Sequence, residues 1–318
     1  MEPVHENSTL HVVLGGGGAA GSAVVRALAS LGERVRAVNR SGVMSVPAGV
    51  ETMAADVSDP AQAALACRGA GVVYNCASPP YDRWTDLFPV FMENITTAAG
   101  RAGARLIFAD NLYMYGPVSG PLTEDTPYNP NNPKGEVRAK VAEDLLAAHR
   151  RGDAQAAIGR ASDFYGPRTN SAMGVRIFEA ALEDKPANII GDPDQPHTYS
   201  YIDDFARGLI LLGEREGALG EVWHIPNDQP TVTTRAFLEK VYAEAGSRLK
   251  IVSANKFLLT VLGLFNPTLR EMRHVYYQFS EPFVVDHSKF ERAFRPLPVT
   301  PQEQAIRETL EWTKSVRP

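Results

Sequence analysis

Three glycines near the start of the chain have the spacing of a nucleotide-binding turn. They lie three residues apart, between an apolar segment, Leu10–Leu14, and a helical pattern, Ala19–Leu31. The first glycine would permit a tight turn, the second would let the backbone approach a pyrophosphate, and the third would let helix and strand pack closely. The N–H groups at a helix start favour anions. The predicted ligands of a dinucleotide pyrophosphate are therefore Gly15, Gly18, Ala19, Ala20 and Gly21.

The end of the second apolar segment, Arg34–Val38, bears on the choice of dinucleotide. An acidic residue here would hold the ribose 2′-hydroxyl of NAD, whereas the guanidinium of Arg40 suits a 2′-phosphate. Asn39 and Ser41 flank Arg40 and are predicted to lie against the cofactor as well. The pattern favours NADP(H) over NAD(H), unless Arg40 is only a solvated loop charge.

Short apolar segments alternate with helical patterns up to about residue 160, an arrangement that would position this turn. The predicted strands are Leu10–Leu14, Arg34–Val38, Val50–Ala54, Val72–Cys76, Leu106–Ala109 and Ala156–Gly159. The predicted helices are Ala19–Leu31, Ala61–Cys67, Trp84–Arg101 and Lys134–His149. Strands that alternate with helices form parallel sheets, and nearly all-apolar strands are covered on both faces. The predicted fold class is α/β, a doubly wound Rossmann sheet.

The pattern changes after residue 160, where proline and glycine become frequent and loops lengthen. We predict a dinucleotide-binding domain over residues 1–160 and a smaller C-terminal α/β substrate lobe over residues 161–318. Segments near 198–226 should return to the first domain, with Glu221–Ile225 as the candidate for an added strand. The further predicted helices are Asp203–Leu212, Thr234–Glu244 and Pro301–Trp312.

The composition argues against several classes of partner. The chain has 318 residues, 44% of them hydrophobic, and a formal net charge of -5 without a block of like charges, so neither nucleic acid nor a membrane is an expected partner. Two cysteines are too few for a disulfide framework and fit a reduced, cytoplasmic compartment. The polar start is unlike a signal peptide, and no apolar run approaches the roughly 20 residues of a membrane helix. The histidines show no zinc-binding spacing, so no metal is expected.

Further segments resemble the extended short-chain dehydrogenase/reductase family, in its NAD(P)-dependent epimerase/dehydratase branch, over nearly the whole chain. These segments are Asp56–Val57, Asn75–Ala77, Phe108–Gly116, Gly159–Pro167 and Tyr199–Asp204. The resemblance implies that the carboxylate of Asp56 contacts the adenine amine. The other cofactor-lining residues that it implies are Val57, Cys76, Ala77 and Ser78.

The chain departs from the family at two of its three catalytic groups. The family uses Tyr-x-x-x-Lys, in which the lysine holds the nicotinamide ribose and lowers the pKa of the tyrosine, together with a Ser or Thr. Lys140 matches the lysine, whereas Glu136 stands at the tyrosine position and Asn111 at the serine position. Glu136 is either structural, which we favour, or an acid whose pKa is raised by burial. Lys134 and Arg138 should share a solvated face, with binding of an anionic substrate as the alternative.

Other residues could supply the missing proton or contact the substrate. Tyr113 lies just past the fifth predicted strand, at a position where the family has no tyrosine, and is a candidate proton donor beside Glu136. The residues predicted to face the substrate are Tyr115, Asp163, Tyr165, His197 and Tyr199. For each of these, packing or a loop role is the alternative.

Together these features favour an NADP(H)-dependent oxidoreductase that acts on a small carbonyl, imine or alkene through an atypical proton donor. One alternative is an epimerase or dehydratase of a sugar-like substrate, which the lost tyrosine weakens because that cycle needs an acid and a base at one oxygen. Another is a non-catalytic NADP(H) sensor. The resemblance also implies a homodimer, in which helices Trp84–Arg101 and Lys134–His149 pack through alanines as a four-helix bundle.

Overall fold

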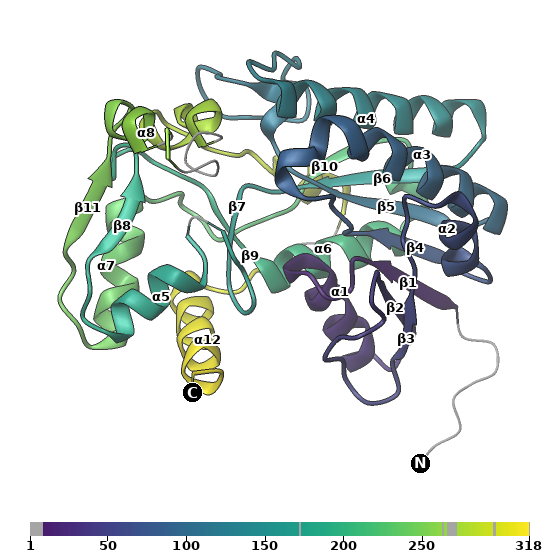
Figure 1. Cartoon of the computed structure of the whole chain (residues 1–318), viewed down its shortest axis with the longest axis horizontal. Helices are drawn as coiled ribbons and strands as arrows, with labels where there is room; N and C mark the ends of the chain where they lie inside the picture. The colour runs from purple at the N-terminus through teal and green to yellow at the C-terminus, as the bar shows by residue number, and fades with distance from the viewer. Residues whose placement is uncertain (1–8, 172, 263, 266–271, 295–296, 318) are drawn as a thin grey trace. The chain divides into compact units, whose positions relative to one another are not determined.

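The chain is described by a computed structural model over residues 9–171, 173–262, 264–265, 272–294 and 297–317 (Figure 1). Its contacts divide these residues into two compact units. Unit 1 contains described residues 9–114, 133–160 and 205–225, and unit 2 contains those of 115–132, 161–204 and 226–317. The polar start of the chain, residues 1–8, on which the signal-peptide expectation was based, lies outside the described residues.

Unit 1 is built on a seven-stranded parallel sheet of order β10-β6-β5-β4-β1-β2-β3. The strands are β1 Leu10–Leu14, β2 Arg34–Asn39, β3 Glu51–Ala54, β4 Val72–Asn75, β5 Arg105–Asp110, β6 Gln155–Arg160 and β10 Val222–His224. The strand order continues outward in both directions from the β1–β4 pair, as in a doubly wound sheet. The predicted Rossmann fold class is confirmed, and the predicted strand Glu221–Ile225 is present as the edge strand β10.

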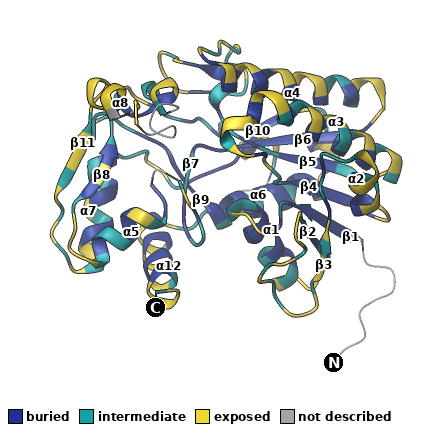
Figure 2. Cartoon of the chain, viewed as in Figure 1, coloured by how far each residue is buried: buried dark blue, intermediate teal, exposed yellow. Residues whose placement is uncertain are grey.

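Helices cover both faces of this sheet, so the apolar strands are buried on two sides (Figures 1 and 2). On one face lie α2 Pro60–Cys67, α3 Trp84–Ala102 and α4 Pro133–Arg151, and on the other lie α1 Ala19–Ser30 and α6 Ile202–Glu214. Adjacent residues of β1 show this burial on both faces. Val12 packs in the core under α2–α4, and Val13, which points to the opposite face of the sheet, is equally buried.

The alanines expected at a dimer interface are mostly buried inside the chain itself. Ala98 and Ala99 of α3, with Ala142 of α4, belong to the core cluster between these helices and the sheet. Ala148 is buried as well. Small residues here permit close packing of helix on sheet, so they do not support a four-helix bundle between two copies. A homodimer stays a prediction.

Unit 2 combines short paired strands with helices around a second core. Strands β8 Ala187–Ile190 and β11 Ile251–Ala254 pair in parallel, as do β7 Asp163–Tyr165 and β9 Tyr199–Tyr201. Its helices are α5 Val175–Leu182, α7 Thr234–Ala245, α8 Lys256–Leu262, α10 Tyr277–Ser280, α11 Ser288–Ala293 and α12 Gln302–Ser315. Helices α5, α7 and α12 share one apolar core. The helices predicted at Thr234–Glu244 and Pro301–Trp312 are present as α7 and α12, whereas β7, β8, β9 and β11 were not predicted.

Within the described parts of the chain, every helix is too short or too polar to cross a lipid bilayer.

A buried histidine lies on β1 in unit 1. The Tyr74 hydroxyl lies 3.3 Å from Nδ1 of His11, and the Glu33 carboxylate lies 3.6 Å from Nε2. Burial lowers the pKa of His11, and the nearby Glu33 only partly offsets this effect. The folded state therefore holds His11 neutral at a pH where the unfolded chain already binds a proton.

We predict that the free energy of unfolding rises with pH between the lowered pKa of His11 and about 6.5, because the unfolded state binds more protons in that window. Each unit by which the pKa is lowered corresponds to about 1.4 kcal/mol. Urea unfolding at a series of pH values should show this rise, and the His11→Gln protein should lack it. The exposed His274 provides the control, because His274→Gln should retain the rise.

Candidate active site

The glycine turn after β1 leaves no room for side chains where chain segments approach each other. Gly15 has φ +78°, and a Cβ on it would lie 2.6 Å from the Cys76 carbonyl oxygen. A Cβ on Gly21 would lie 2.2 Å from the Gly15 carbonyl oxygen. At Gly18 a Cβ would meet only that same oxygen, at 3.4 Å. Gly15 and Gly21 are therefore required by the turn itself, while Gly18 leaves open space beside the start of α1.

The start of α1 has the character of an anion site. Gly18 is its N-cap in extended backbone geometry and makes no side-chain capping hydrogen bond. The N–H groups of the first turn, including those of Ala19, Ala20 and Gly21, therefore have no capping side chain, and the helix dipole adds positive potential there. Open space at Gly18 and uncapped N–H groups fit the pyrophosphate of a dinucleotide.

The loop after β2 is shaped by Asn39. Its Oδ1 accepts hydrogen bonds from the backbone N–H groups of Ser41, at 3.1 Å, and Gly42, at 2.6 Å. Its Nδ2 donates to the carbonyl oxygen of Val43 at 3.1 Å. Arg40 is exposed on this loop. Asn39 was predicted to contact the cofactor, but in this structure its amide is engaged in holding the loop that carries Arg40.

Asp56, predicted to lie near the adenine, caps the turn after β3. Its Oδ1 accepts from the backbone N–H of Ser58 at 2.9 Å and from the Ser58 hydroxyl at 2.7 Å. These bonds lower the pKa of Asp56, and the charge of Arg40 acts in the same direction. Asn94 of α3 donates to the carbonyl oxygen of Val57 at 3.0 Å and fixes the same turn. Asn94 was missed, because its partner is distant in the sequence.

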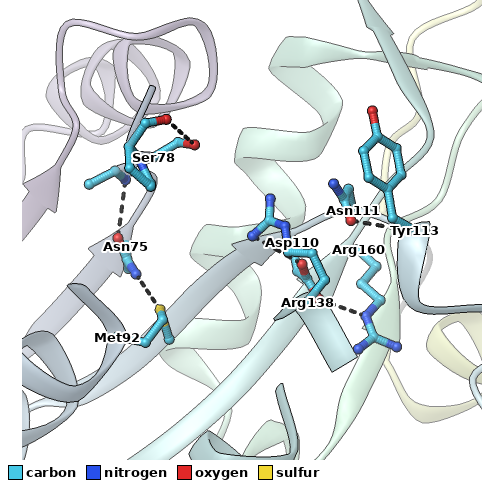
Figure 3. A network of polar contacts seen from close by, with 10 residues as sticks. Asn75, Ser78, Met92, Asp110, Asn111, Tyr113, Arg138 and Arg160 are labelled. Carbon is cyan, nitrogen blue, oxygen red and sulfur yellow. Dashed lines mark hydrogen bonds and ion pairs between the residues drawn. The ribbon is translucent and has the colours of Figure 1, made fainter. Parts of the chain in front are cut away.

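The segment after β4 is held by a hydrogen-bonded asparagine (Figure 3). Oδ1 of Asn75 accepts from the backbone N–H of Ala77 at 3.1 Å, and its Nδ2 donates to Sδ of Met92 at 3.1 Å. The Ser78 hydroxyl donates to the carbonyl oxygen of the next residue at 3.2 Å. Burial raises the pKa of the Cys76 thiol to about 12, so this cysteine is no thiolate nucleophile at neutral pH.

One carboxylate at the end of β5 contacts two buried guanidinium groups (Figure 3). Oδ2 of Asp110 accepts from Nε of Arg160 at 2.9 Å, and its Oδ1 lies 3.3 Å from Nη1 of Arg138. The Asp110 and Arg160 side chains have no exposed surface. Because Arg138 comes from α4 and Arg160 from β6, this ion cluster joins three elements at one end of the sheet.

Aromatic rings surround the guanidinium of Arg138. Its Cζ lies 4.2 Å from the ring centre of Phe88, 4.5 Å from Trp84 and 5.6 Å from Phe108. The cation–π attraction in such contacts partly offsets the loss of hydration when the guanidinium is buried. Burial lowers the pKa of Arg138, and Asp110 opposes that effect.

The inner face of α4 carries a different pair of residues from the one expected. Lys134 is 8% exposed and Arg138 6%, and Nζ of Lys134 lies 4.2 Å above the ring of Tyr81. The prediction of a solvated face for Lys134 and Arg138 is therefore wrong. Glu136 lies on the exposed face, and so does Lys140, whose Nζ bonds Asp144 at 2.7 Å. Since α4 has 3.6 residues per turn, residues 134 and 138 face inward while 136 and 140 face outward.

This orientation corrects the comparison with Tyr-x-x-x-Lys. The side chain of Lys140, matched to the lysine of that motif, is 64% exposed and paired with its own helix neighbour. The residues four apart that do face inward are Lys134 and Arg138. The sequence comparison did not distinguish the two faces of α4, because the burial of Lys134 and Arg138 depends on partners outside this helix.

Asn111 and Tyr113 follow β5 next to this cluster. Oδ1 of Asn111 accepts from the backbone N–H of Tyr113 at 3.1 Å, and the Tyr113 ring lies 6.0 Å from that of Trp84. Figure 3 shows the Tyr113 hydroxyl pointing away from the Asp110 ion cluster. Tyr115, by contrast, is fully buried in unit 2 and packs edge-on against Tyr128.

The other residues expected at the substrate lie in unit 2 and are mostly buried. Tyr165 packs against Phe178 and Phe237, and the Tyr199 hydroxyl bonds the Thr234 hydroxyl at 2.7 Å. These contacts place both tyrosines in the core of unit 2. Their positions fit a packing role, which was the alternative to a substrate contact. Their side chains therefore expose little surface to a ligand.

Asp163 and His197 form a hydrogen-bonded pair in the same unit. Nε2 of His197 lies 2.9 Å from Oδ2 of Asp163, and Nδ1 lies 3.0 Å from the carbonyl oxygen of Gln278. His197 is buried between Phe279 and Phe283, while the side chain of Asp163 is 21% exposed. Of these four unit 2 candidates, Asp163 offers the most surface to a ligand.

The described residues contain no group of three or more His, Cys, Asp or Glu side chains placed to hold a metal ion.

The glycine turn, the uncapped helix and the parallel sheet define a dinucleotide-binding protein of the Rossmann class. The family model for the NAD dependent epimerase/dehydratase family matches residues 11–225. The chain belongs to this family, which is a family of enzymes.

The curated relatives differ in activity. The chain is 26% identical over 210 residues to dTDP-glucose 4,6-dehydratase of Neisseria gonorrhoeae, covering 63% of this chain and 56% of the relative. It is 25% identical over 253 residues to 2-alkyl-3-oxoalkanoate reductase of Stenotrophomonas maltophilia, covering 74% and 76%. Other curated relatives are covered over 60% and 42% of their length, so the chain spans only part of several of the relatives that it matches.

The fold is similar to that of a solved UDP-glucose 4-epimerase of Thermus thermophilus in complex with NAD. The TM-score is 0.78 at 21% identity, covering 97% of this chain and all of that one. The family supports the epimerase/dehydratase alternative better than the reductase that the sequence put first. It also favours an enzyme over a non-catalytic sensor.

We predict that Asp110→Asn lowers the free energy of unfolding by about 3–5 kcal/mol, the usual cost of breaking a buried ion pair. Two buried guanidinium groups would then lack their shared counter-charge. Urea unfolding measures this effect, and Asp144→Asn, which removes the exposed partner of Lys140, is the control and should change stability little. Equal stability of the two variants would show that the Asp110 ion cluster does not stabilise the contact between α4 and the ends of β5 and β6.

Proposed function

We propose that this chain binds NAD(P) at the glycine turn and acts as an epimerase or dehydratase on a sugar-nucleotide-like substrate. The observation that carries the proposal is the uncapped start of α1 beside the open space at Gly18, in a chain that belongs to this family. The dehydratase relative and the fold of the UDP-glucose epimerase support the substrate class.

The cofactor, when bound, supplies and accepts a hydride, and the chain's own residues must then orient it and move a proton. The start of α1 would hold the pyrophosphate, and the turn after β3 would lie at the adenine. Cys76, Ala77 and Ser78 would line the cofactor after β4. Unit 1 thus supplies candidate ligands for the cofactor at the carboxyl ends of its strands.

Proton transfer is proposed to occur at the cluster after β5. Tyr113 and Asn111 lie there, and Lys134 and Arg138 enter from α4. Glu136 and Lys140 lie on the exposed face of that helix, so they are less suited to this role. The Tyr113 hydroxyl points away from the Asp110 ion cluster, but Tyr113 still interacts electrostatically with Arg138. A nearby positive charge stabilises the ionised form of a phenol and so makes proton transfer easier.

A second candidate function is reduction of a ketone, as first expected from the sequence. It is favoured by the relative named 2-alkyl-3-oxoalkanoate reductase, whose match extends over 74% of this chain and 76% of the relative. Reduction of a ketone uses one hydride transfer, from the cofactor to the substrate, so the cofactor leaves oxidised. An epimerase or dehydratase cycle uses two, one from the substrate to the cofactor and one back, so the cofactor is restored within one turnover.

We predict that Gly18→Val abolishes dinucleotide binding, because its side chain would fill the space beside the start of α1. Calorimetric titration with NADPH and NADH measures this loss. Gly217→Val is the matched control, since a Cβ there meets nothing within 4 Å, and binding should be unchanged. Retained binding in Gly18→Val would remove the basis of the proposal.

The preference for NADP(H) over NAD(H) is also proposed, and it is supported by the exposed position of Arg40 on the loop after β2. Arg40→Ala should weaken binding of NADPH by about tenfold or more, the effect of losing about 1.4 kcal/mol. Binding of NADH should change little. An equal loss for both cofactors in the same titration would assign Arg40 to another role.

A further inference from the structure

We propose that Lys134 and Arg138 form a binding site for a carboxylate group of the substrate. This inference rests on the proposed function, because it names a chemical feature of the substrate handled at that site. It begins from two cations on the inner face of α4, Lys134 and Arg138, for which binding of an anionic substrate was the alternative to a solvated face.

Arg138 is a buried cation whose hydrogen-bonding capacity is only partly used by the chain. Its residue exposure is 6%, and among the described residues its Nε and Nη1 find no hydrogen-bond acceptor. Nη1 lies 3.3 Å from Asp110, but Asp110 also holds Arg160 at 2.9 Å. One carboxylate is thus shared by two guanidinium groups, and buried donors without acceptors are costly.

The cation nearest to Arg138 on the same face of α4 is Lys134, one turn closer to the helix start. Nζ of Lys134 lies above Tyr81, and the ring of Tyr81 packs edge-on to Trp84 at 5.0 Å, which in turn contacts Arg138. The two cations therefore flank one aromatic surface. The first turn of α4 adds the positive end of a 19-residue helix.

This combination suits a carboxylate. The Arg138 guanidinium lies close to three aromatic rings, and its Nε and Nη1 lack hydrogen-bond acceptors among the described residues. A carboxylate is a planar anion that can accept two parallel N–H bonds from a guanidinium. Lys134, the second cation, would add a further attraction to the carboxylate. Binding of this kind involves no covalent or redox step. The side chains that would contact the ligand lie next to Tyr113, where proton transfer is proposed.

The test compares two probes that differ at one carbon, UDP-glucuronate and UDP-glucose, titrated into the full chain with bound NADP⁺. Tryptophan emission gives the readout, since Trp84 contacts Arg138, and Trp84→Phe identifies its contribution. Acetate, oxalate and inorganic phosphate are titrated separately as small anions. We expect UDP-glucuronate to bind about tenfold tighter than UDP-glucose, a difference of about 1.4 kcal/mol.

Lys134→Met should abolish this preference, whereas Lys140→Met, which makes the same change on the exposed face of α4, should retain it. Arg138→Lys tests the guanidinium while keeping a cation beside Asp110, and it should reduce the preference. Equal affinity for the two nucleotides in the unaltered chain would overturn the proposal. So would a preference that survives Lys134→Met.

Failure of this site is distinguishable from failure of the proposed function. If NADP⁺ binds but neither UDP-glucuronate, acetate nor oxalate does, the carboxylate site is wrong and the cofactor assignment stands. If inorganic phosphate binds and the carboxylates do not, the carboxylate assignment is equally overturned. If NADP⁺ does not bind, the proposed function falls, and acetate and oxalate titrated into the cofactor-free chain still decide the anion site.

Discussion

The arrangement of unit 1 depends on a single carboxylate, Asp110, that holds two buried guanidinium groups. Asp110 ends β5, Arg160 ends β6, and Arg138 reaches them from α4. Bringing three charges out of water is expensive, and the cost is offset only when the geometry keeps them together. The aromatic rings of α3 and β5 complete the enclosure of Arg138. These contacts fix the position of α4 relative to the ends of β5 and β6. In this position Lys134 and Arg138 face the interior.

The glycine turn and the Asp110 ion cluster, the two parts of the candidate site, both lie at the carboxyl ends of the strands. Gly15 follows β1, Asn75 ends β4 and Asp110 ends β5, so their side chains or turns all lie at the carboxyl ends of neighbouring parallel strands. Strand order reverses between β1 and β4, and ligands of open α/β sheets bind at such a reversal. The start of α1, the proposed pyrophosphate site, and the cations of α4 thus belong to the same unit.

Much of this sheet was predictable because its central strands, such as β1 and β4, are buried along their whole length and are bounded by glycine or polar residues. Strand ends differ from the predicted ones by a residue or two, as at β5 and β6. The faces of α4 were not predictable, since the motif match favoured Lys140 and only the partners of Arg138, distant in sequence, determine what is buried. In unit 2, β7 and β9 have three residues each, too few to show a period, and their tyrosines could equally have lined a pocket.

Two cations on the inner face of α4 also constrain the chemistry. A guanidinium does not release its proton at neutral pH, so Arg138 acts through its field and its fixed position rather than as an acid. That field favours any group nearby that becomes more negative, whether the ionising phenol of Tyr113 or an oxygen of the substrate. It disfavours a cationic substrate for the same reason. The departure from Tyr-x-x-x-Lys leaves positive charge at this end of the sheet, and under the proposed function that charge favours substrates that carry negative charge.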